Sequence, residues 1–312
     1  MPDDLEPDPV RAARPPGAWF GVMLPQLRMS YDTIVERTLA AEAAGMDSVW
    51  LIDHMAAPAA PQVDYLEAWT VATALATQTT RIRVGHLVLC DTFRHPALLA
   101  KMAASLDVLS GGRLDLGIGW GSVPEELRTY GFGDRPAAER SARLRETLEI
   151  LQLMFAGEPF DHEGTHYELR GALGRPTPVQ QPIPIHIGGG GPKLTMPLVR
   201  DFAQWWNCTS YAVDRLDDLR PLAGDARISI EHPIGLAADD ASRDEVVAIT
   251  ERRFGAWGGL VTGTASEVTD TLLSEVEQGV EGFIFQFHDF GTPETVERFM
   301  SDVAPAVRAA AG

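Results

Sequence analysis

The run Trp19-Phe20-Gly21-Val22-Met23-Leu24-Pro25-Gln26 decides between two possible folds of this chain. Its apolar residues predict a buried strand from Trp19 to Leu24. A doubly wound dinucleotide-binding sheet would carry the glycine fingerprint G-x-G-x-x-G directly after this strand. The strand is instead followed by Pro25 and Gln26. The sequence therefore favours a different α/β arrangement.

Short apolar runs alternate with helical segments along the rest of the chain, which is the pattern of a parallel sheet with crossover helices. The eight predicted strands are Trp19–Leu24, Ser48–Asp53, Ile82–Cys90, Arg113–Trp120, Ile183–Gly188, Trp205–Thr209, Glu231–Ala237 and Gly282–His288. Eight such units in 312 residues fit an α/β fold of the single (β/α)₈ TIM-barrel type. We expect one barrel domain over residues 18–312, with an irregular insertion loop at 157–181 between the fourth helix and the fifth strand.

Capping residues mark the ends of several predicted helices. Ser30 suits the N-cap of a helix that ends at Ala44. Pro96 suits the first position of a helix that stops before Gly111. Thr292 begins the last predicted helix.

The charge balance argues against nucleic acid as a partner. The chain has 26 Lys+Arg and 44 Asp+Glu, so its net charge is 26 − 44 = −18. Binding to a phosphate backbone needs clustered positive charge instead. The two cysteines, Cys90 and Cys208, cannot form a disulfide framework, which favours a reducing compartment.

Residues 1–17 contain five prolines and several acidic residues, and they lack the basic start and apolar stretch of a secretion signal. We expect them to form a disordered leader. No run approaches the roughly 20 apolar residues that a membrane-spanning helix needs. The sequence therefore predicts a cytoplasmic protein with no membrane partner.

Asp53 and His54 directly follow the second predicted strand. In a barrel the carboxyl ends of the strands form the reactive face. An imidazole beside a carboxylate there could act as an acid or base near neutral pH. The alternative is a histidine that only caps local backbone.

The fourth predicted strand has a bare face. Gly117, Gly119 and Gly121 share one parity, so they lie on one side of the strand. Glycine weakens a strand, which suggests that something flat or bulky lies against this face. Tight packing inside the barrel would explain the same pattern. Ser122 and Glu125 follow at the mouth of the strand.

The run Gly188-Gly189-Gly190-Gly191-Pro192-Lys193 follows the fifth predicted strand. With Pro192 as the first residue of a helix, the loop would present free backbone N–H groups at a positive helix end. Lys193 adds a charge beside it, so we predict an anion site that suits phosphate. A flexible tight turn is the alternative.

Four histidines, His86, His186, His232 and His288, lie on or near different predicted strands. This distribution raises the possibility of a metal-dependent hydrolase. The His-x-His pair that such barrels usually carry on the first strand is missing, so we expect most of these histidines to be structural and predict no metal site.

Taken together, these motifs resemble the bacterial luciferase-like superfamily of flavin and deazaflavin oxidoreductases. The resemblance extends from about Phe20 to Val307. It rests on Asp53-His54, Arg94-His95-Pro96, Leu109-Ser110-Gly111-Gly112-Arg113, Leu116-Gly117-Ile118-Gly119-Trp120-Gly121, Gly188 to Lys193 and Trp206-Asn207, which occur in family order. The branch that uses the deazaflavin coenzyme F420 looks closest, because it typically carries Asp-His after the second strand.

The resemblance implies a flat tricyclic cofactor at the mouth of the barrel, with its phosphate on the glycine loop. It implies a non-proline cis peptide or a bulge at Leu87 and Val88. His54 becomes the candidate acid/base, and Asp53 a catalytic and cofactor-contacting residue. The candidate cofactor-binding residues are Asp53, Leu87, Val88, Cys90, Gly119, Trp120, Gly121, Ser122, Glu125, Gly188, Gly189, Gly190, Gly191 and Lys193.

Ser122 departs from the family pattern. In the deazaflavin-dependent enzymes that oxidise alcohols, notably those of the glucose-6-phosphate dehydrogenase type, a glutamate follows the glycines of the fourth strand. Glu125 or Glu126 could replace it only if the loop folds back. Reduction of an alkene, imine or ketone is thus as well supported as sugar-phosphate oxidation. Lys193, Arg94 and Arg28 are candidate positive charges for the anionic tail of F420.

Two alternatives to an F420-dependent hydride-transfer enzyme stay open. One is an FMNH₂-dependent monooxygenase of the same superfamily, to which a separate flavin reductase supplies the reduced flavin. For an F420-dependent enzyme, a separate F420 reductase would supply reduced F420 in the same way. The other is a barrel that binds flavin without catalysis. The resemblance also suggests a homodimer through helices near Leu66 to Leu75 and Pro96 to Leu109.

Overall fold

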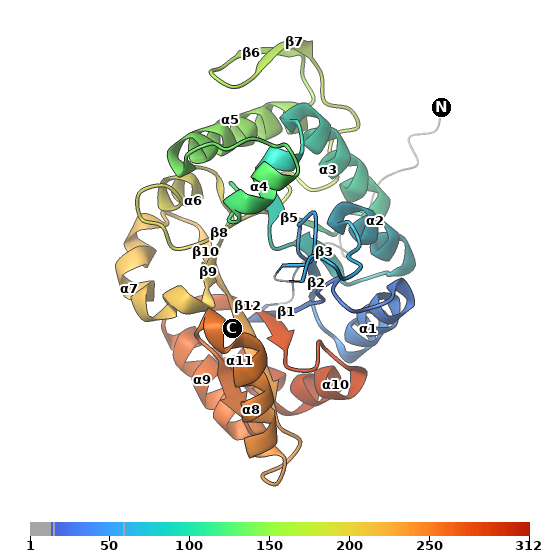
Figure 1. Ribbon diagram of the computed structural model, residues 1–312, viewed down its shortest axis with the longest axis vertical. Helices are drawn as coiled ribbons and strands as arrows, with labels where there is room; N and C mark the ends of the chain where they lie inside the picture. The colour runs from blue at the N-terminus through green and yellow to red at the C-terminus, as the bar shows by residue number, and fades with distance from the viewer. Residues whose placement is uncertain (1–13, 15, 59) are drawn as a thin grey trace.

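Eight parallel strands close into a ring within the described part of the chain (Figure 1). A computed structural model describes residues 14, 16–58 and 60–312, so most of the predicted leader, residues 1–17, lies outside the described residues. The ring runs β1 (Trp19–Met23), β2 (Ser48–Leu51), β3 (Arg83–His86), β5 (Leu114–Gly119), β8 (Ile185–Gly188), β9 (Trp205–Thr209), β10 (Arg227–Leu236) and β12 (Val280–Phe287), with β12 pairing back to β1. The predicted TIM barrel is confirmed.

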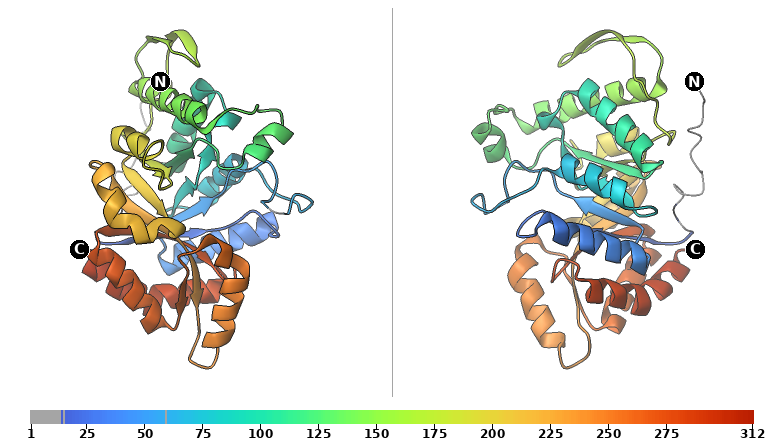
Figure 2. Two further views of the ribbon diagram at one scale, coloured as in Figure 1. Left: turned by 60° about the vertical axis from the view of Figure 1, so that its left-hand side comes forward. Right: turned by 90° about the vertical axis from the view of Figure 1, so that its right-hand side faces the viewer.

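Helices surround this ring on its outer side (Figures 1 and 2). They are α1 (Tyr31–Ala44), α2 (Ala68–Gln78), α3 (Pro96–Ser110), α4 (Pro124–Thr129), α5 (Ala137–Ala156), α6 (Met196–Phe202), α7 (Leu216–Leu219), α8 (Arg243–Phe254), α9 (Ala265–Glu277), α10 (Pro293–Asp302) and α11 (Ala304–Ala310). The predicted ends at Ala44, Pro96 and Thr292 are confirmed, although α11 and not α10 is the last helix. Across the described ranges, no helix is both long and apolar enough to cross a bilayer.

The third predicted strand, Ile82–Cys90, is wrong as one continuous element. It divides into β3 and β4 (Leu89–Cys90), with a cis peptide bond between Leu87 and Val88. Gly85 pairs with Asp115 and Leu89 pairs with Ile118, so four steps along β3–β4 match three along β5. This extra residue is a β-bulge. The expected cis peptide and bulge are both present.

The insertion at 157–181 is more regular than predicted. It contains an antiparallel hairpin of β6 (Phe160–Glu163) and β7 (Glu168–Ala172), which stands at the edge of the molecule beside α5 (Figure 1). Glu146 of α5 accepts hydrogen bonds from the backbone N–H groups of His166 and Tyr167 at 2.9 and 2.7 Å. The hairpin is thereby attached to the outer helical layer, away from the barrel mouth. A short strand that the sequence did not predict, β11 (Val261–Gly263), pairs with β10 outside the ring.

Strand alternation divides the apolar residues between two cores. Phe20 and Phe285 face outward and pack on Phe299 of α10, with ring centroids 5.3 and 4.7 Å apart. Trp19 faces inward, as every second residue of a strand must. It packs inside the barrel in a cluster of Trp19, Met23, Trp50, Leu87, Trp205 and Ile284.

A plug of aromatic and charged side chains fills the amino-terminal half of the barrel interior. The Trp19 ring lies 5.3 Å from that of Trp205, and the guanidinium of Arg14 lies 3.8 Å from the Trp19 ring. Asp115, at the start of β5, pairs with Arg14 at 2.7 Å and with Arg83 at 3.0 Å. This plug leaves the carboxyl ends of the strands as the place for an open site.

Candidate active site

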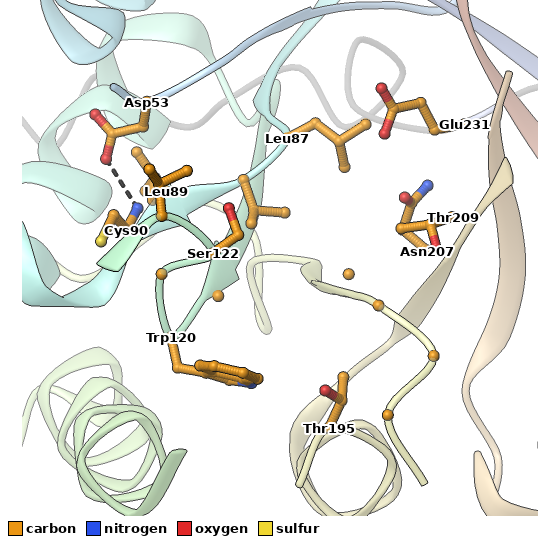
Figure 3. Close-up of a pocket in the computed structure, with 18 of the residues that line it drawn as sticks. Asp53, Leu87, Leu89, Cys90, Trp120, Ser122, Thr195, Asn207, Thr209 and Glu231 are labelled. Atoms are coloured by element: carbon orange, nitrogen blue, oxygen red, sulfur yellow. Dashed lines mark hydrogen bonds between the residues drawn. The ribbon is translucent and has the colours of Figure 1, made fainter. Parts of the chain in front are cut away.

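A cavity of about 820 Å³ opens at the carboxyl ends of the barrel strands (Figure 3). This volume is in the range of pockets that hold a cofactor or a drug-sized ligand. Its lining includes most of the predicted site residues, namely Asp53, His54, Leu87, Val88, Cys90, Gly119, Trp120, Gly121, Ser122 and Gly188 to Gly191.

Glu125 and Lys193 are the two predicted site residues that do not line the cavity. Glu125 is exposed and pairs with Arg128 at 2.6 Å. Lys193 is also exposed. In this structure neither side chain reaches the cavity wall, so a role for Glu125 or Lys193 in binding the cofactor stays a prediction.

His54 is held by a carboxylate from α4. Its Nδ1 lies 2.9 Å from Oε2 of Glu126, whose Oε1 accepts the backbone N–H of Met55 at 2.7 Å. Burial alone would raise the pKa of Glu126, but the hydrogen bond and charge of His54 and the Met55 amide hold it below its ordinary value. The loop does fold back, and it brings Glu126 rather than Glu125 to the cavity. The carboxylate of Glu126 thus fixes one ring nitrogen of His54 and leaves Nε2 outside this contact.

The two carboxylate oxygens of Asp53 accept hydrogen bonds from other groups of the protein. Its Oδ2 accepts the backbone N–H of Cys90 at 2.9 Å, which is the dashed line in Figure 3, and both its oxygens accept from Arg94 at 2.6 and 3.0 Å. Arg94 also pairs with Glu67 at 2.6 Å. Asp53 therefore fixes the end of β2 against β4, and Arg94 is neutralised rather than available for an anionic tail. Burial raises the pKa of the Cys90 thiol to about 12, so this cysteine is not a thiolate nucleophile.

The glycines of β5 make room for the bulge. A Cβ on Gly117 would lie 1.8 Å from the carbonyl oxygen of His86, and one on Gly119 would lie 2.9 Å from Val88. At Gly117, the glycine face of β5 therefore packs against the protein's own backbone and not against a ligand. This corrects the expectation of a ligand at that position. The bulge in turn carries Leu87 toward the middle of the cavity (Figure 3).

The glycine loop differs from the predicted helix end. Helix α6 begins at Met196 and not at Pro192, because Pro192 to Thr195 form a turn in which the N–H groups of Thr195 and Met196 both donate to the Gly191 carbonyl at 3.0 Å. The Gly189 N–H donates to Asn207 O at 3.1 Å. Within the described chain, the amides of Gly190 and Gly191 donate to no protein acceptor. These two amides are the available donors of the loop.

Arg140 of α5 is a cavity residue that the sequence analysis missed. Its side chain is buried, its guanidinium lies 5.1 Å from the Trp120 ring, and its Nε has no hydrogen-bond partner among the described residues. The adjacent Ser141 donates to Leu194 O at 3.0 Å, which ties α5 to the glycine loop. The cation at this end of the cavity is therefore Arg140. No local signal distinguishes it from the other arginines of α5.

Glu231, Asn207 and Thr209 also line the cavity and were not predicted as site residues. The four histidines of the metal hypothesis do not converge. In the part of the chain that the structure describes, no group of three or more His, Cys, Asp or Glu side chains is arranged to hold a metal ion. His86 and His186 are buried, and burial lowers the pKa of each to about 4.

Curated proteins similar to this chain are F420-dependent glucose-6-phosphate dehydrogenases. The protein from Amycolatopsis mediterranei (strain U-32) is 35% identical over 162 residues, which are 51% of this chain and 48% of that protein. The protein from Mycobacterium avium (strain 104) is 38% identical over 165 residues, 52% of this chain and 48% of its own length. These alignments span about half the length of these relatives.

Solved structures with the same fold come from enzymes of different activity. An F420-dependent secondary alcohol dehydrogenase, in complex with an F420-acetone adduct, superposes with a TM-score of 0.79 at 18% identity, covering 94% of this chain and 99% of that one. The EDTA monooxygenase from Chelativorans sp. BNC1 also has a TM-score of 0.79, at 16% identity, covering 94% of each chain. At such low identity these matches establish the fold alone.

The family model described as luciferase-like monooxygenase matches residues 15–230, which is more than half of the sequence. This match and the shared barrel agree with the resemblance drawn from the motifs. The chain belongs to the luciferase-like monooxygenase family.

Proposed function

We propose that this protein is an F420-dependent oxidoreductase that transfers a hydride between the deazaflavin and a small organic substrate, with His54 as the acid/base. The observation that carries the proposal is that the His54–Glu126 pair and the glycine loop line one cavity. The curated relatives that use F420 support the choice of cofactor.

The residues that line the cavity fit a bound F420 molecule in two respects. The apolar wall of Leu87 and Val88 suits a flat ring, and the unpaired amides of Gly190 and Gly191 together with Arg140 suit a phosphate. F420, when bound, supplies two-electron hydride chemistry itself. The protein then has to position the reactants and handle one proton.

His54 handles that proton in this account. Its Nδ1 is held by Glu126, so Nε2 is the atom that gives or takes the proton. Glu126 is a positioning residue, because it acts through the imidazole. It also fixes the chain after β2 through the Met55 amide, which keeps the imidazole at the cavity.

The cavity does not suit a second phosphate. Among the described residues that line the cavity, Arg140 is the only arginine and there is no lysine. If Arg140 binds the cofactor phosphate, a sugar phosphate finds no cation of its own. We therefore propose a substrate without a phosphate group, unlike that named for the curated relatives.

Parallel titrations with F420 and with reduced FMN test the choice of cofactor, each followed by fluorescence. We expect saturable binding of F420, and an affinity loss of about tenfold or more in Arg140→Gln, because a charge-assisted hydrogen bond to phosphate is lost. Arg145→Gln changes a half-buried arginine of the same helix that pairs with Asp201 and does not line the cavity. It is the matched control and should bind F420 as the wild type does.

Three results of these titrations contradict parts of the proposal. Binding of reduced FMN without binding of F420 would favour an FMN-dependent monooxygenase. Unchanged F420 affinity in Arg140→Gln would remove this residue from the phosphate site. Tight F420 binding without turnover on a broad panel of alcohols, ketones, imines and alkenes would favour a non-catalytic barrel.

We further propose a homodimer, with a separate reductase that supplies the reduced cofactor. Leu98 and Leu109 of α3 are 54% and 60% exposed, which suits a helix face covered by a second copy. This is the helix that the resemblance to the family indicates as an interface.

A further inference from the structure

Three polar side chains share one wall of the cavity, formed by β9 and β10. Asn207 and Thr209 are two residues apart on β9, so both point to the same side of the strand. Glu231 of β10 is paired in register with Thr209. All three line the cavity. In Figure 3 they lie across the cavity from Asp53 and Cys90, with Leu87 between.

The protein does not satisfy these groups. The hydroxyl oxygen of Thr209 is buried and has no hydrogen-bond partner among the described residues. Asn207 donates its Nδ2 to Ser229 Oγ at 3.1 Å, while its carbonyl oxygen accepts from no described residue. The Glu231 side chain is half-buried at the cavity wall, and among the described residues the charge of His232 is the one that acts on its carboxyl. Native proteins pair nearly all their buried polar groups, so the unpaired Thr209 hydroxyl, with the Asn207 and Glu231 oxygens on the same cavity wall, points to a ligand.

The surroundings of Glu231 favour a ligand that donates a proton or hydrogen bond. Burial raises the pKa of Glu231 to about 7, with a smaller opposing effect from His232. His232 points away, since its two ring nitrogens lie 2.9 Å from Gly259 O and from Glu275. The β12 residue in register with Glu231 is Ile284, which carries no charge. Among the described residues that line the cavity, no arginine or lysine other than Arg140 is present, so an anionic ligand beside Glu231 would be repelled.

We propose that Glu231, Thr209 and Asn207 form the substrate subsite of this cavity, selective for substrates that carry an O–H or N–H donor, namely alcohols and amines. The inference rests on the proposed function for the identity of the cofactor, and it adds which end of the cavity takes the substrate. The glycine loop and Arg140 supply the anion-binding groups, which leaves the Glu231 wall for a neutral or cationic group. Glu231 is then a specificity-determining residue.

The ligand test uses three small probes of similar shape: cyclohexylamine, cyclohexanol and methylcyclohexane. Their affinities are measured by calorimetry on the F420-loaded protein and again without cofactor. We expect the two donor-bearing probes to bind about tenfold or more tightly than methylcyclohexane, and Glu231→Gln to remove that preference for the amine. Glu277→Gln makes the same chemical change on exposed α9 and should behave as the wild type.

A second measurement does not depend on ligand affinity. Burial also raises the pKa of Asp91 to about 6, so infrared difference spectra should show two carboxyls that titrate near neutral pH in the wild type and in Glu277→Gln. The one near pH 7 should be missing in Glu231→Gln. Equal binding of the three probes, or a preference for cyclohexylamine over methylcyclohexane that survives in Glu231→Gln, would overturn the subsite.

F420 titration separates this inference from the proposed function. Glu231→Gln should bind F420 with wild-type affinity, and a large loss would make Glu231 a cofactor contact instead. If the wild type itself fails to bind F420, the proposed function fails, whereas the probe preference without cofactor still decides the subsite.

Discussion

The His54→Ala variant is expected to turn over substrate about 10²–10⁴-fold more slowly than the wild type, which is the range for loss of a general acid or base. F420 affinity should change little, because the proposed cofactor contacts lie at Leu87, Val88, the glycine loop and Arg140. The measurement is steady-state F420 turnover with the best substrate from a panel, together with F420 binding by fluorescence. Wild-type turnover with intact binding would remove His54 from the mechanism.

Two neighbouring glutamates provide a matched pair for the same experiment. Glu126→Gln keeps the side chain's size but weakens the hold on Nδ1 of His54, so turnover should fall while F420 binding persists. Glu125→Gln, one residue earlier on the same helix, alters an exposed ion pair with Arg128 and should have no effect. Equal effects of the two changes would contradict the positioning role of Glu126.

The Asp115→Asn variant is expected to lose about 3–5 kcal/mol of unfolding free energy at neutral pH, because the substitution leaves the buried charges of Arg14 and Arg83 without their carboxylate. Urea denaturation of the wild type and the variant measures this loss. Asp270→Asn, on the exposed side of α9, is the control and should stay within about 0.5 kcal/mol of the wild type.

The same comparison has a defined pH dependence. Burial by itself would raise the pKa of Asp115, but the charges of Arg14 and Arg83 hold it well below the ordinary value. A carboxyl with a lowered pKa stabilises the folded state above its unfolded pKa, and this contribution declines as the pH falls into the acid range. The difference between wild type and Asp115→Asn should therefore shrink in acid. A difference below about 1 kcal/mol at neutral pH would contradict the account.

The barrel could be predicted because the apolar periodicity of the strands and the capping residues of the helices indicate the same order of elements. The apolar run from Trp19 and the capping residues Ser30 and Pro96 depend on local periodicity and local hydrogen bonds, and the structure has these elements in place. The break in the third strand was expected only from the family resemblance. Leu87 and Val88 are ordinary strand residues, so nothing local marks the bulge.

The cavity residues that were missed depend on tertiary arrangement. Glu125 and Glu126 are adjacent on one helix, and only the direction in which α4 packs decides that Glu126 meets His54. Arg140 lies on the side of α5 and Glu231 in the middle of β10, so neither follows a strand end, where the sequence predicts the reactive face of a barrel. Lys193 was assigned to the site from a helix start at Pro192, and the turn that replaces this start leaves the lysine exposed.

We infer that the cavity binds a redox heterocycle with its anionic end at the glycine loop. A crystal structure of the protein soaked with F420 tests it most directly. We predict electron density for the tricyclic ring against Leu87 and Val88, with the phosphate within hydrogen-bond distance of the amides of Gly190 and Gly191 and of Arg140. Density for the ring at another place on the barrel, or a phosphate that lies away from this loop, would contradict the account.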